Sequence, residues 1–442
     1  MTRRLVSLVA CAALGVAADA TRAADPPPAD PSDAATVRVL GHPRPYLRPR
    51  RELLTDALRT PDDSAKPWLE WEHATGDWGG LRPEMHERGI LLGLDYTAQL
   101  FSNVRGGETT RDATHAAGLA TFSASLDTQR LGLWKGGTFF AAGDHQDGRG
   151  VSREVGSLAD IGTLDVGDEH FTQLTEAYYQ HNFADDHFAV RFGKDDANDA
   201  FVDSELAALY LNGDFAPPSN IPMPTFPDPA LGLALFGEPT PWLSLAAGAY
   251  GADLGRHENG GAGLFRGRVF AIAELTLHAS PLGLPGHYNA GAWLRSVETP
   301  DPRDATGTAS SPRNYGAYAL FDQRLFAPDP GRPDRGLGAW FLLSWAPSDR
   351  NLNDLWVGGG LVYTGLLPSR ASDQLGFGVS MADLVVAPSG QPNPPVEIVV
   401  EGFYAIQLAP WLALQPDLQY VVNPMRGGRN ALVVGAGLSI DL

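Results

Sequence analysis

Cysteine and lysine are nearly absent from this chain of 442 residues, which has one cysteine, Cys11, and three lysines against thirty arginines. No run of 18 or more apolar residues follows the extreme N-terminus, which argues against a transmembrane helix. Cys11 lies in the N-terminal apolar stretch. If that stretch is removed, the chain has no thiol for a disulfide, a cysteine-bound metal or a cysteine nucleophile.

The N-terminus is typical of an exported protein. Two arginines precede an apolar stretch at residues 5–18, and small residues follow at Ala23 and Ala24. Residues 1–24 are therefore predicted to be a secretory signal peptide. The alternative is lipoprotein-type processing at Cys11, for which the apolar stretch, residues 5–10, is unusually short. Residues 25–67 are rich in proline and are predicted to form a flexible linker or extension.

The chain is strongly acidic, with a formal charge of -19. Three arginines and one aspartate leave with residues 1–24, so the processed chain has a charge of -21. This charge argues against a nucleic-acid partner, because binding to phosphates needs a clustered basic surface.

From residue 90 onward, apolar and polar residues alternate with a period of two. Residues 90–100 and 432–442 show it most clearly, and this pattern indicates strands with one dry face and one wet face. Together with these two segments, about sixteen such stretches occur, and the alternation is weakest at 231–236. The others lie near residues 117–127, 137–146, 172–183, 187–194, 242–250, 268–279, 287–296, 316–326, 338–347, 354–364, 375–386, 396–409 and 412–423.

The pattern favours an all-β fold, a transmembrane antiparallel β-barrel of about sixteen strands over residues 90–442. Closure leaves no unpaired backbone edge in hydrocarbon, and the segment has room for sixteen membrane strands with their connections. A soluble β-sandwich or propeller is the alternative. Residues 68–89 are predicted to form a separate N-terminal segment with a short helix. Four turn-rich inserts are expected to form extracellular loops or loops folded inward: 147–170, 195–229, 251–263 and 299–314.

Three ordered segments carry a resemblance to a known family. Residues 75–82 read Thr-Gly-Asp-Trp-Gly-Gly-Leu-Arg; residues 176–178, Glu-Ala-Tyr, are followed by Gly-Lys-Asp-Asp-Ala-Asn at 193–198; and residues 415–420 read Gln-Pro-Asp-Leu-Gln-Tyr, with Asn-Pro at 423–424. Together they resemble the carbohydrate-selective porin family of Gram-negative outer membranes. Within the first segment, Asp77 is expected to cap backbone amides of a turn rather than to act as a catalytic acid.

The resemblance implies a sixteen-stranded outer-membrane barrel through which sugars such as glucose diffuse into the periplasm. The implied partners are sugars and outer-membrane lipid, with no cofactor and no energy coupling. The chain departs from the pattern in two places. It ends in Leu442, where many outer-membrane barrels have an aromatic residue, and residues 25–67 have no counterpart.

Five candidate residues for the pore lining lie around the second of these segments. A sugar pore needs charged and amide groups that exchange hydrogen bonds with hydroxyls. Arg191 lies on the polar side of its strand, and Lys194, Asp196 and Asn198 close it, while Glu176 lies on the strand before. The competing interpretation is an ordinary turn with solvated charges.

Four further candidates come from the polar faces of other strands. If Tyr288, Ala290, Ala292 and Leu294 face lipid, then Trp293 and Arg295 point into the lumen. Glu274 and Asp95 oppose apolar neighbours in the same way. By default, however, a polar residue that faces the lumen only forms part of the pore wall and does not touch the solute.

The sequence contains no motif for a catalytic or metal site. The aspartates at 195–203 lack the glycine and the terminal glutamate of a calcium loop. A sugar or lipid hydrolase that uses Glu397 and Glu401 is a second hypothesis, but two residues four apart on a strand are separated by about 13 Å, which is farther than a glycosidase pair. A general or cation-preferring porin is a third. A monomer and a homotrimer both remain open.

Overall fold

The computed structural model describes residues 66–442, except 168–169, 216, 254–266, 282, 330, 333 and 387–394. The predicted signal peptide and all but the last two residues of the predicted 25–67 extension lie outside the described residues.

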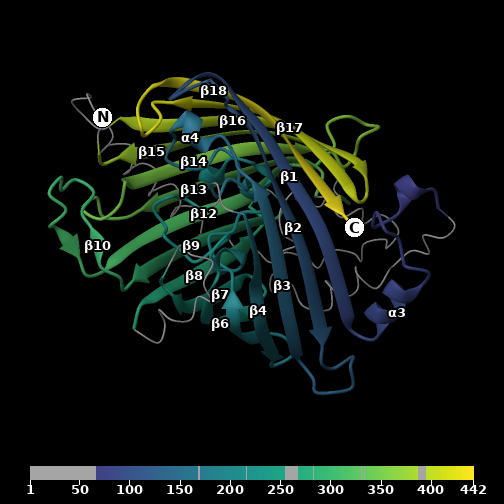
Figure 1. Ribbon diagram of the computed structural model, residues 1–442. Helices are drawn as coiled ribbons and strands as arrows, with labels where there is room; N and C mark the ends of the chain where they lie inside the picture. Colours follow the sequence, from purple (N-terminus) through teal and green to yellow (C-terminus); the bar gives the residue numbers. More distant parts are fainter. Residues whose placement is uncertain are drawn as a thin grey trace.

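Sixteen antiparallel strands close into one barrel in the described part of the chain, with β1 hydrogen-bonded to β18 (Figure 1). Each strand otherwise pairs with its neighbours in sequence, apart from the small β10–β11 hairpin. The predicted all-β barrel is confirmed. The barrel strands are β1 (Ile90–Gly107), β2 (Thr114–Asp127), β3 (Gly137–Gly148), β4 (Phe171–Phe183), β5 (Phe188–Asp195), β6 (Ala230–Thr240), β7 (Leu243–Gly251), β8 (Val269–Ala279), β9 (Gly286–Arg295), β12 (Asn314–Phe326), β13 (Gly336–Trp345), β14 (Asn353–Thr364), β15 (Gln374–Leu384), β16 (Val396–Ala409), β17 (Leu412–Val422) and β18 (Arg429–Asp441).

The remaining elements are short. The β10–β11 hairpin pairs Thr299–Pro300 with Ser310–Ser311, at one of the predicted inserts. The helices are η2 (Trp68–Glu70), α3 (Leu81–Glu87), α4 (Ser152–Val155), η3 (Ala197–Asp199), η4 (Ala207–Leu209) and η5 (Gly213–Phe215). None of these helices has the length and apolar character needed to cross a membrane.

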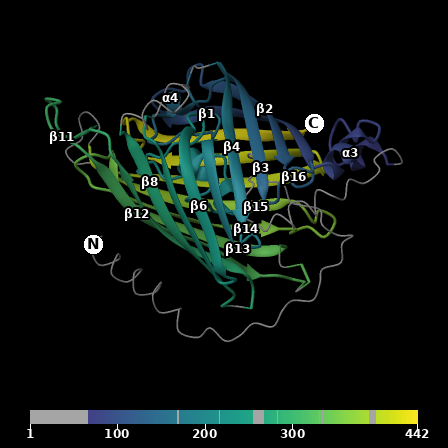
Figure 2. The ribbon, with the colours of Figure 1, turned by 90° about the horizontal axis from the view of Figure 1, so that it is seen from below.

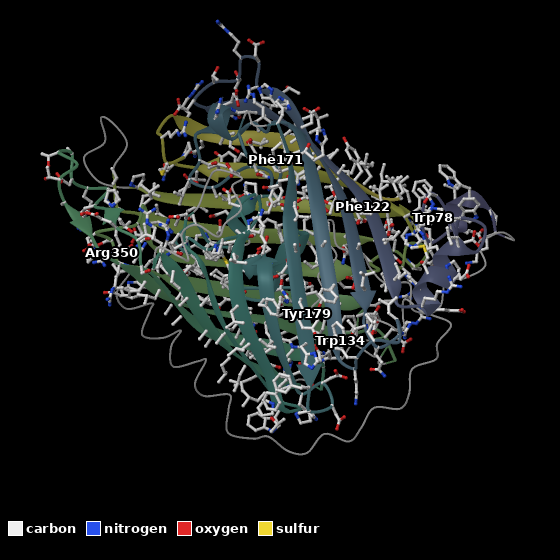
Figure 3. The ribbon with its side chains drawn as sticks, turned by 60° about the horizontal axis from the view of Figure 1, so that its bottom comes forward. Trp78, Phe122, Trp134, Phe171, Tyr179 and Arg350 are labelled. Carbon is white, nitrogen blue, oxygen red and sulfur yellow. The ribbon has the colours of Figure 1, made fainter. Side chains whose placement is uncertain are left out.

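The period-two pattern of each strand separates an outer face from an inner face. On β1, Leu94 and Leu100 are exposed, whereas Gln99 and Phe101 between and beside them are buried inside the barrel. On β2, Phe122 also points outward, with 53% of its surface exposed (Figure 3). Exposed apolar side chains that alternate with buried polar ones invert the rule for soluble proteins, as expected for a wall that meets lipid.

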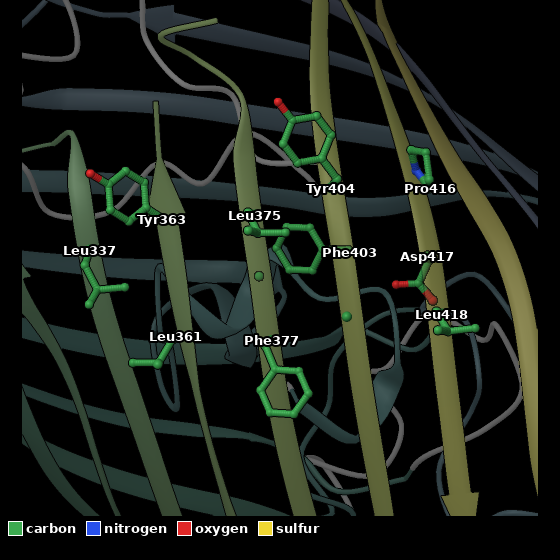
Figure 4. A pocket seen from close by; sticks show the side chains of 12 residues that line it. Leu337, Leu361, Tyr363, Leu375, Phe377, Phe403, Tyr404, Pro416, Asp417 and Leu418 are labelled. Carbon is green, nitrogen blue, oxygen red and sulfur yellow. The ribbon is translucent and has the colours of Figure 1, made fainter. Parts of the chain in front are cut away.

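The outer wall has a shallow apolar hollow of about 570 Å³ over β13–β17 (Figure 4). Gly402 of β16 lies at its centre, directly opposite Phe377 of β15 and Leu418 of β17. The hollow arises because this outward position has no side chain between two large ones. It belongs to the lipid-facing surface and not to the interior.

Aromatic residues gather at the end of the barrel that has the short turns. The indole nitrogen of Trp134 donates to the hydroxyl of Tyr179 at 2.8 Å, and the ring of Tyr179 packs against Phe139 (Figure 3). Amphipathic rings at this level are typical of the interface between membrane and water.

Residues 68–89, here named the N-terminal clasp, hold the end of β18. The clasp and the C-terminus lie side by side at one end of the barrel (Figures 1 and 2). Trp68 packs on Trp411 with ring centroids 4.5 Å apart, and Arg82 donates to the carbonyl oxygen of Leu442 at 2.8 Å. The carboxylate of Asp77 accepts from the backbone amide of Gly79, which confirms the predicted turn cap. The clasp thus joins the start of the barrel to its last residues.

Candidate functional site

The predicted inserts at 147–170 and 195–229 have described residues that fold into the barrel. We name residues 196–229 the inner loop and residues 149–170 the upper loop. The segment 201–215 of the inner loop is almost entirely buried. Its Tyr210 packs against Phe215, Trp340 and Phe403, with ring centroids 4.8, 5.5 and 5.0 Å away. The inner loop therefore packs against the inner faces of β13 and β16.

Carboxylates on the barrel wall bind the backbone amides of the inner loop. Glu401 accepts from the amides of Leu211 and Asn212 at 2.7 and 3.0 Å. Glu274 accepts from the amide of Val202 at 3.0 Å. Buried carboxylates need such donors, because an unpaired buried charge is costly.

Asp322 of β12 is the third of these wall carboxylates. It accepts from the hydroxyl of Ser204 at 2.7 Å and from the amides of Glu205 and Leu206 at 3.1 and 3.3 Å. Glu274, Asp322 and Glu401, here named the wall carboxylates, lie on three separate strands. They fix the path of the inner loop at three points.

The inner loop also presents groups of its own to the wall. Asp214 accepts hydrogen bonds from the indole nitrogen of Trp356 and from the hydroxyl of Ser380. The amide of Gln415 donates to the carbonyl oxygen of Leu209 at 2.9 Å. These contacts hold the inner loop against the same side of the barrel as the packing of Tyr210.

The upper loop is held in a similar way. Glu397 accepts from the amides of Leu158 and Met425. Gln99 of β1 donates to the hydroxyl of Thr163 at 2.8 Å. Glu397 and Glu401, the pair considered for hydrolysis, therefore bind the backbone amides of different connections: Glu397 those of the upper loop and of the β17–β18 connection, and Glu401 those of the inner loop.

Of the five residues predicted around the second family segment, Arg191 is at the centre of a buried group. Its guanidinium is 2.9 Å from the carboxylate of Asp195 and lies over the ring of Tyr178, 4.5 Å from the centroid. It also donates to Gln180 at 3.1 Å. Glu176 lies close enough for the charges of Arg191 and of the aspartates at 195, 196 and 199 to act on it.

Asp196 and Asn198 lie at the start of the inner loop and close it. Asp196 accepts from the backbone amides of Asn198 and Phe226, both at 2.8 Å, so it ties the two ends of the loop together. Burial, with the nearby charge of Asp199, raises the pKa of Asp196 to about 7. Asn198 donates to the carbonyl oxygen of Phe201 at 3.0 Å.

The structure does not bring Lys194 into this buried group. The strand alternation aligns Lys194 with Phe188 and Phe192, whose rings are exposed on the outer face. Its ammonium donates to the carbonyl oxygen of Leu174 at 2.7 Å.

The four candidates from other strands are separated. Trp293 points inward and is buried, stacked on Phe270 at 6.1 Å. Arg295 donates to the carbonyl oxygen of Ala252 at 3.0 Å, and Glu274 is a wall carboxylate. Asp95 lies far from them on β1, opposite Asp441, and remains partly exposed.

The loops inside the barrel cover its inner wall unequally in the half that lies nearest the short turns. On β15–β17 the inner-face residues Gln374, Phe403 and Gln415 are buried, with at most 7% of their surface exposed. On β1–β4 Asp127 at the end of β2 is buried, but seven polar inner-face residues of the same half remain partly exposed. These residues, here named the open wall, are Asp95, Thr97, Ser123, Ser125, Thr138, Gln180 and Asn182.

Sequence reasoning missed Asp322 and Asp214, and it did not assign Glu274 and Glu401 to the loop. A carboxylate at an inward position was the available signal, but the position alone does not distinguish a loop contact from a pore contact. Within the described residues, no cluster of three or more histidines, cysteines or carboxylates could hold a metal ion.

Residues 111–442 match the family described as carbohydrate-selective porin, OprB family. The chain belongs to this porin family. The resemblance predicted from the sequence is thus confirmed, although residues 75–82, its first segment, precede the matched range. The protein is an outer-membrane channel for carbohydrates and not an enzyme, so the hydrolase hypothesis is wrong.

Similarity to individual proteins agrees with the assignment of this chain to the porin family. It is 23% identical to Porin B of Pseudomonas aeruginosa over 421 residues, which cover 81% of this chain and 89% of the relative. A high-pH structure of Pseudomonas putida OprB has a TM-score of 0.75 at 22% identity, covering 84% of this chain and 99% of that one. The low-pH structure of the same protein has a TM-score of 0.57 at the same identity and coverage. These structures support the fold.

Proposed function

We propose that neutral sugars cross this porin by passive diffusion along the open wall. The observation that carries the proposal is the unequal covering of the interior. The wall carboxylates and the packing of Tyr210 keep the inner loop on one side, while polar side chains on β1–β4 stay accessible. Long loops face the outside of the cell and short turns the periplasm in such barrels, so the open wall lines the periplasmic half of the path.

Hydroxyl, amide and carboxylate groups of the open wall suit a polyhydroxylated solute. Ser123, Gln180 and Asp95 together offer both donors and acceptors, and sugar hydroxyls can pair with either. Asn198 and Asp196 lie at the base of the inner loop and Arg191 lies beneath it. We assign these three residues to shaping the constriction and Asp95 to direct contact with the solute. No cofactor enters this mechanism.

A tryptophan on the open wall tests the path. Ser123→Trp places a large ring inside, and Ala124→Trp, the next residue on the same strand, places the same ring on the outer face. In liposome swelling with glucose, Ser123→Trp should slow the rate several-fold and Ala124→Trp should leave it unchanged. Equal rates in wild type and Ser123→Trp would contradict the proposed path.

A cation-preferring channel is the second candidate, favoured by the charges around Arg191. Three carboxyl groups, those of Glu176, Asp195 and Asp199, lie near this one guanidinium. Such an excess of negative charge would concentrate cations in the lumen. The reversal potential in a salt gradient separates the two: a value near zero supports a neutral-sugar channel, and a strongly cation-selective value with no glucose flux supports the alternative.

A monomer and a homotrimer are the two oligomeric states expected from the sequence. The mass of the porin in detergent, measured by light scattering, distinguishes them.

A further inference from the structure

Two histidines lie directly opposite each other on the inner wall. His278 of β8 and His287 of β9 form a cross-strand pair next to the turn that joins these strands. By the alternation of β8, His278 lies on the same inner face as Glu274, and by that of β9, His287 lies on the same inner face as Trp293. His287 is exposed and His278 partly exposed, so water in the lumen reaches the pair.

The two imidazoles meet through their Nδ1 atoms. These atoms are 2.8 Å apart, and the ring planes are nearly perpendicular, at 86°. The other ring nitrogen of His278, Nε2, is 2.7 Å from the hydroxyl oxygen of Ser244 on β7. When this hydroxyl accepts the Nε2 proton, the Nδ1 atom of His278 carries a lone pair directed at the Nδ1 atom of His287.

We propose that His278 and His287 form a binding site for a divalent transition-metal ion on the lumen wall of this porin. Two nitrogens bound to one such ion at about 2.0–2.1 Å lie about 2.9–3.4 Å apart for bond angles between square and tetrahedral. The observed 2.8 Å between the Nδ1 atoms therefore needs to widen by only a few tenths of an ångström.

The surroundings supply a support for this site, and within the described residues no third histidine, cysteine or carboxylate joins the pair. Ser244 orients His278 through the nitrogen that does not face the metal, which is the usual arrangement around ligating histidines. Asp322 lies opposite His287 on β12, but its carboxylate is held by Ser204, Glu205 and Leu206. Lumen water completes the coordination, and imidazole ligands favour Cu²⁺, Ni²⁺ and Zn²⁺ over Mg²⁺ and Ca²⁺.

The test is Cu²⁺ binding by the full-length porin, purified without a histidine tag and folded in detergent. Millimolar Mg²⁺ is kept present to occupy carboxylates on the acidic surface. Wild type should bind one equivalent, with an electron paramagnetic resonance spectrum that shows two nitrogen ligands. His278→Ala and His287→Ala should each bind at least tenfold more weakly. Ser244→Ala, which removes only the support, should weaken binding about tenfold.

His187→Ala is the matched control, because this histidine lies in a turn and its ring hydrogen-bonds the carbonyl oxygen of Glu238. It should bind copper as wild type does. Heat-modifiable migration on gels verifies that each variant is a folded barrel. A wild-type spectrum without two nitrogens, or unchanged binding in the double variant His278→Ala/His287→Ala, would overturn the proposal.

Discussion

The imidazole of His73 lies 2.7 Å from the carboxylate of Asp441, although 368 residues separate them in the chain. This contact joins the N-terminal clasp to the last strand, next to the bond from the amide of Ala74 to the carbonyl oxygen of Asp441. The barrel closes where β18 pairs with β1, so the clasp reinforces that seam.

Replacing His73 with alanine should therefore weaken the seam without changing transport. We expect His73→Ala to lower the temperature at which the folded band converts to the unfolded one on gels by a few degrees, since a hydrogen bond to a charged group contributes about 1.5–3 kcal/mol. Glucose flux should stay at the wild-type rate. His187→Ala, far from the seam, serves as control, and an identical conversion temperature for both variants would refute a role for the clasp.

Loss of a wall carboxylate should widen the pore. In Glu401→Gln one of the two acceptor oxygens becomes an NH₂ group that faces an amide donor of the inner loop, leaving a buried donor unsatisfied at a cost of about 1–3 kcal/mol. Disaccharide flux should rise several-fold relative to glucose flux in swelling assays. Glu205→Gln makes the same change on an exposed side chain of the inner loop and should behave as wild type. An unaltered ratio of the two fluxes in Glu401→Gln would show that the loop does not depend on this carboxylate.

The buried carboxyl group of Asp196 should make stability depend on pH. Burial and Asp199 raise its pKa to about 7, against an ordinary value of about 3.9. Between these values the folded state holds a proton that the unfolded state lacks, so this stabilisation is present at acidic pH and is lost as the pH rises through 7.

Unfolding in urea at pH 5.5 and pH 8 measures this effect. Wild type should lose about 2 kcal/mol of unfolding free energy over this interval through Asp196 alone. Asp196→Asn should lose correspondingly less. The same pH dependence in both proteins would remove Asp196 as its source.

An arginine on the outer wall should be costly if that wall meets lipid. Ala273 points outward between Ala247 of β7 and Ala292 of β9. Ala273→Arg should lower the unfolding free energy in lipid vesicles by about 2–4 kcal/mol, the cost of a cation near the bilayer midplane. Ala273→Leu is the matched control and should be nearly neutral. A neutral effect of the arginine in vesicles would mean that this face is not in hydrocarbon.

The strands were predictable because their signal is local. Alternation sets the face of each side chain from its immediate neighbours, so even the weakest predicted strand, 231–236, exists as β6. The inward direction of Trp293 and the turn cap at Asp77 follow from the same short-range rules.

The sequence by itself determined the sixteen strands, their two faces and the family, because period and motif order are read along the chain. Only the tertiary structure decided which inserts enter the lumen and what each inward polar residue contacts there. Glu401 and Leu211 are 190 residues apart, and Glu274 is bound to the inner loop while Asp95 lies on the open wall, although both occupy inward positions. Closing the barrel sets which strands face each other across the interior, and that arrangement determines whether a carboxylate meets a backbone amide or water.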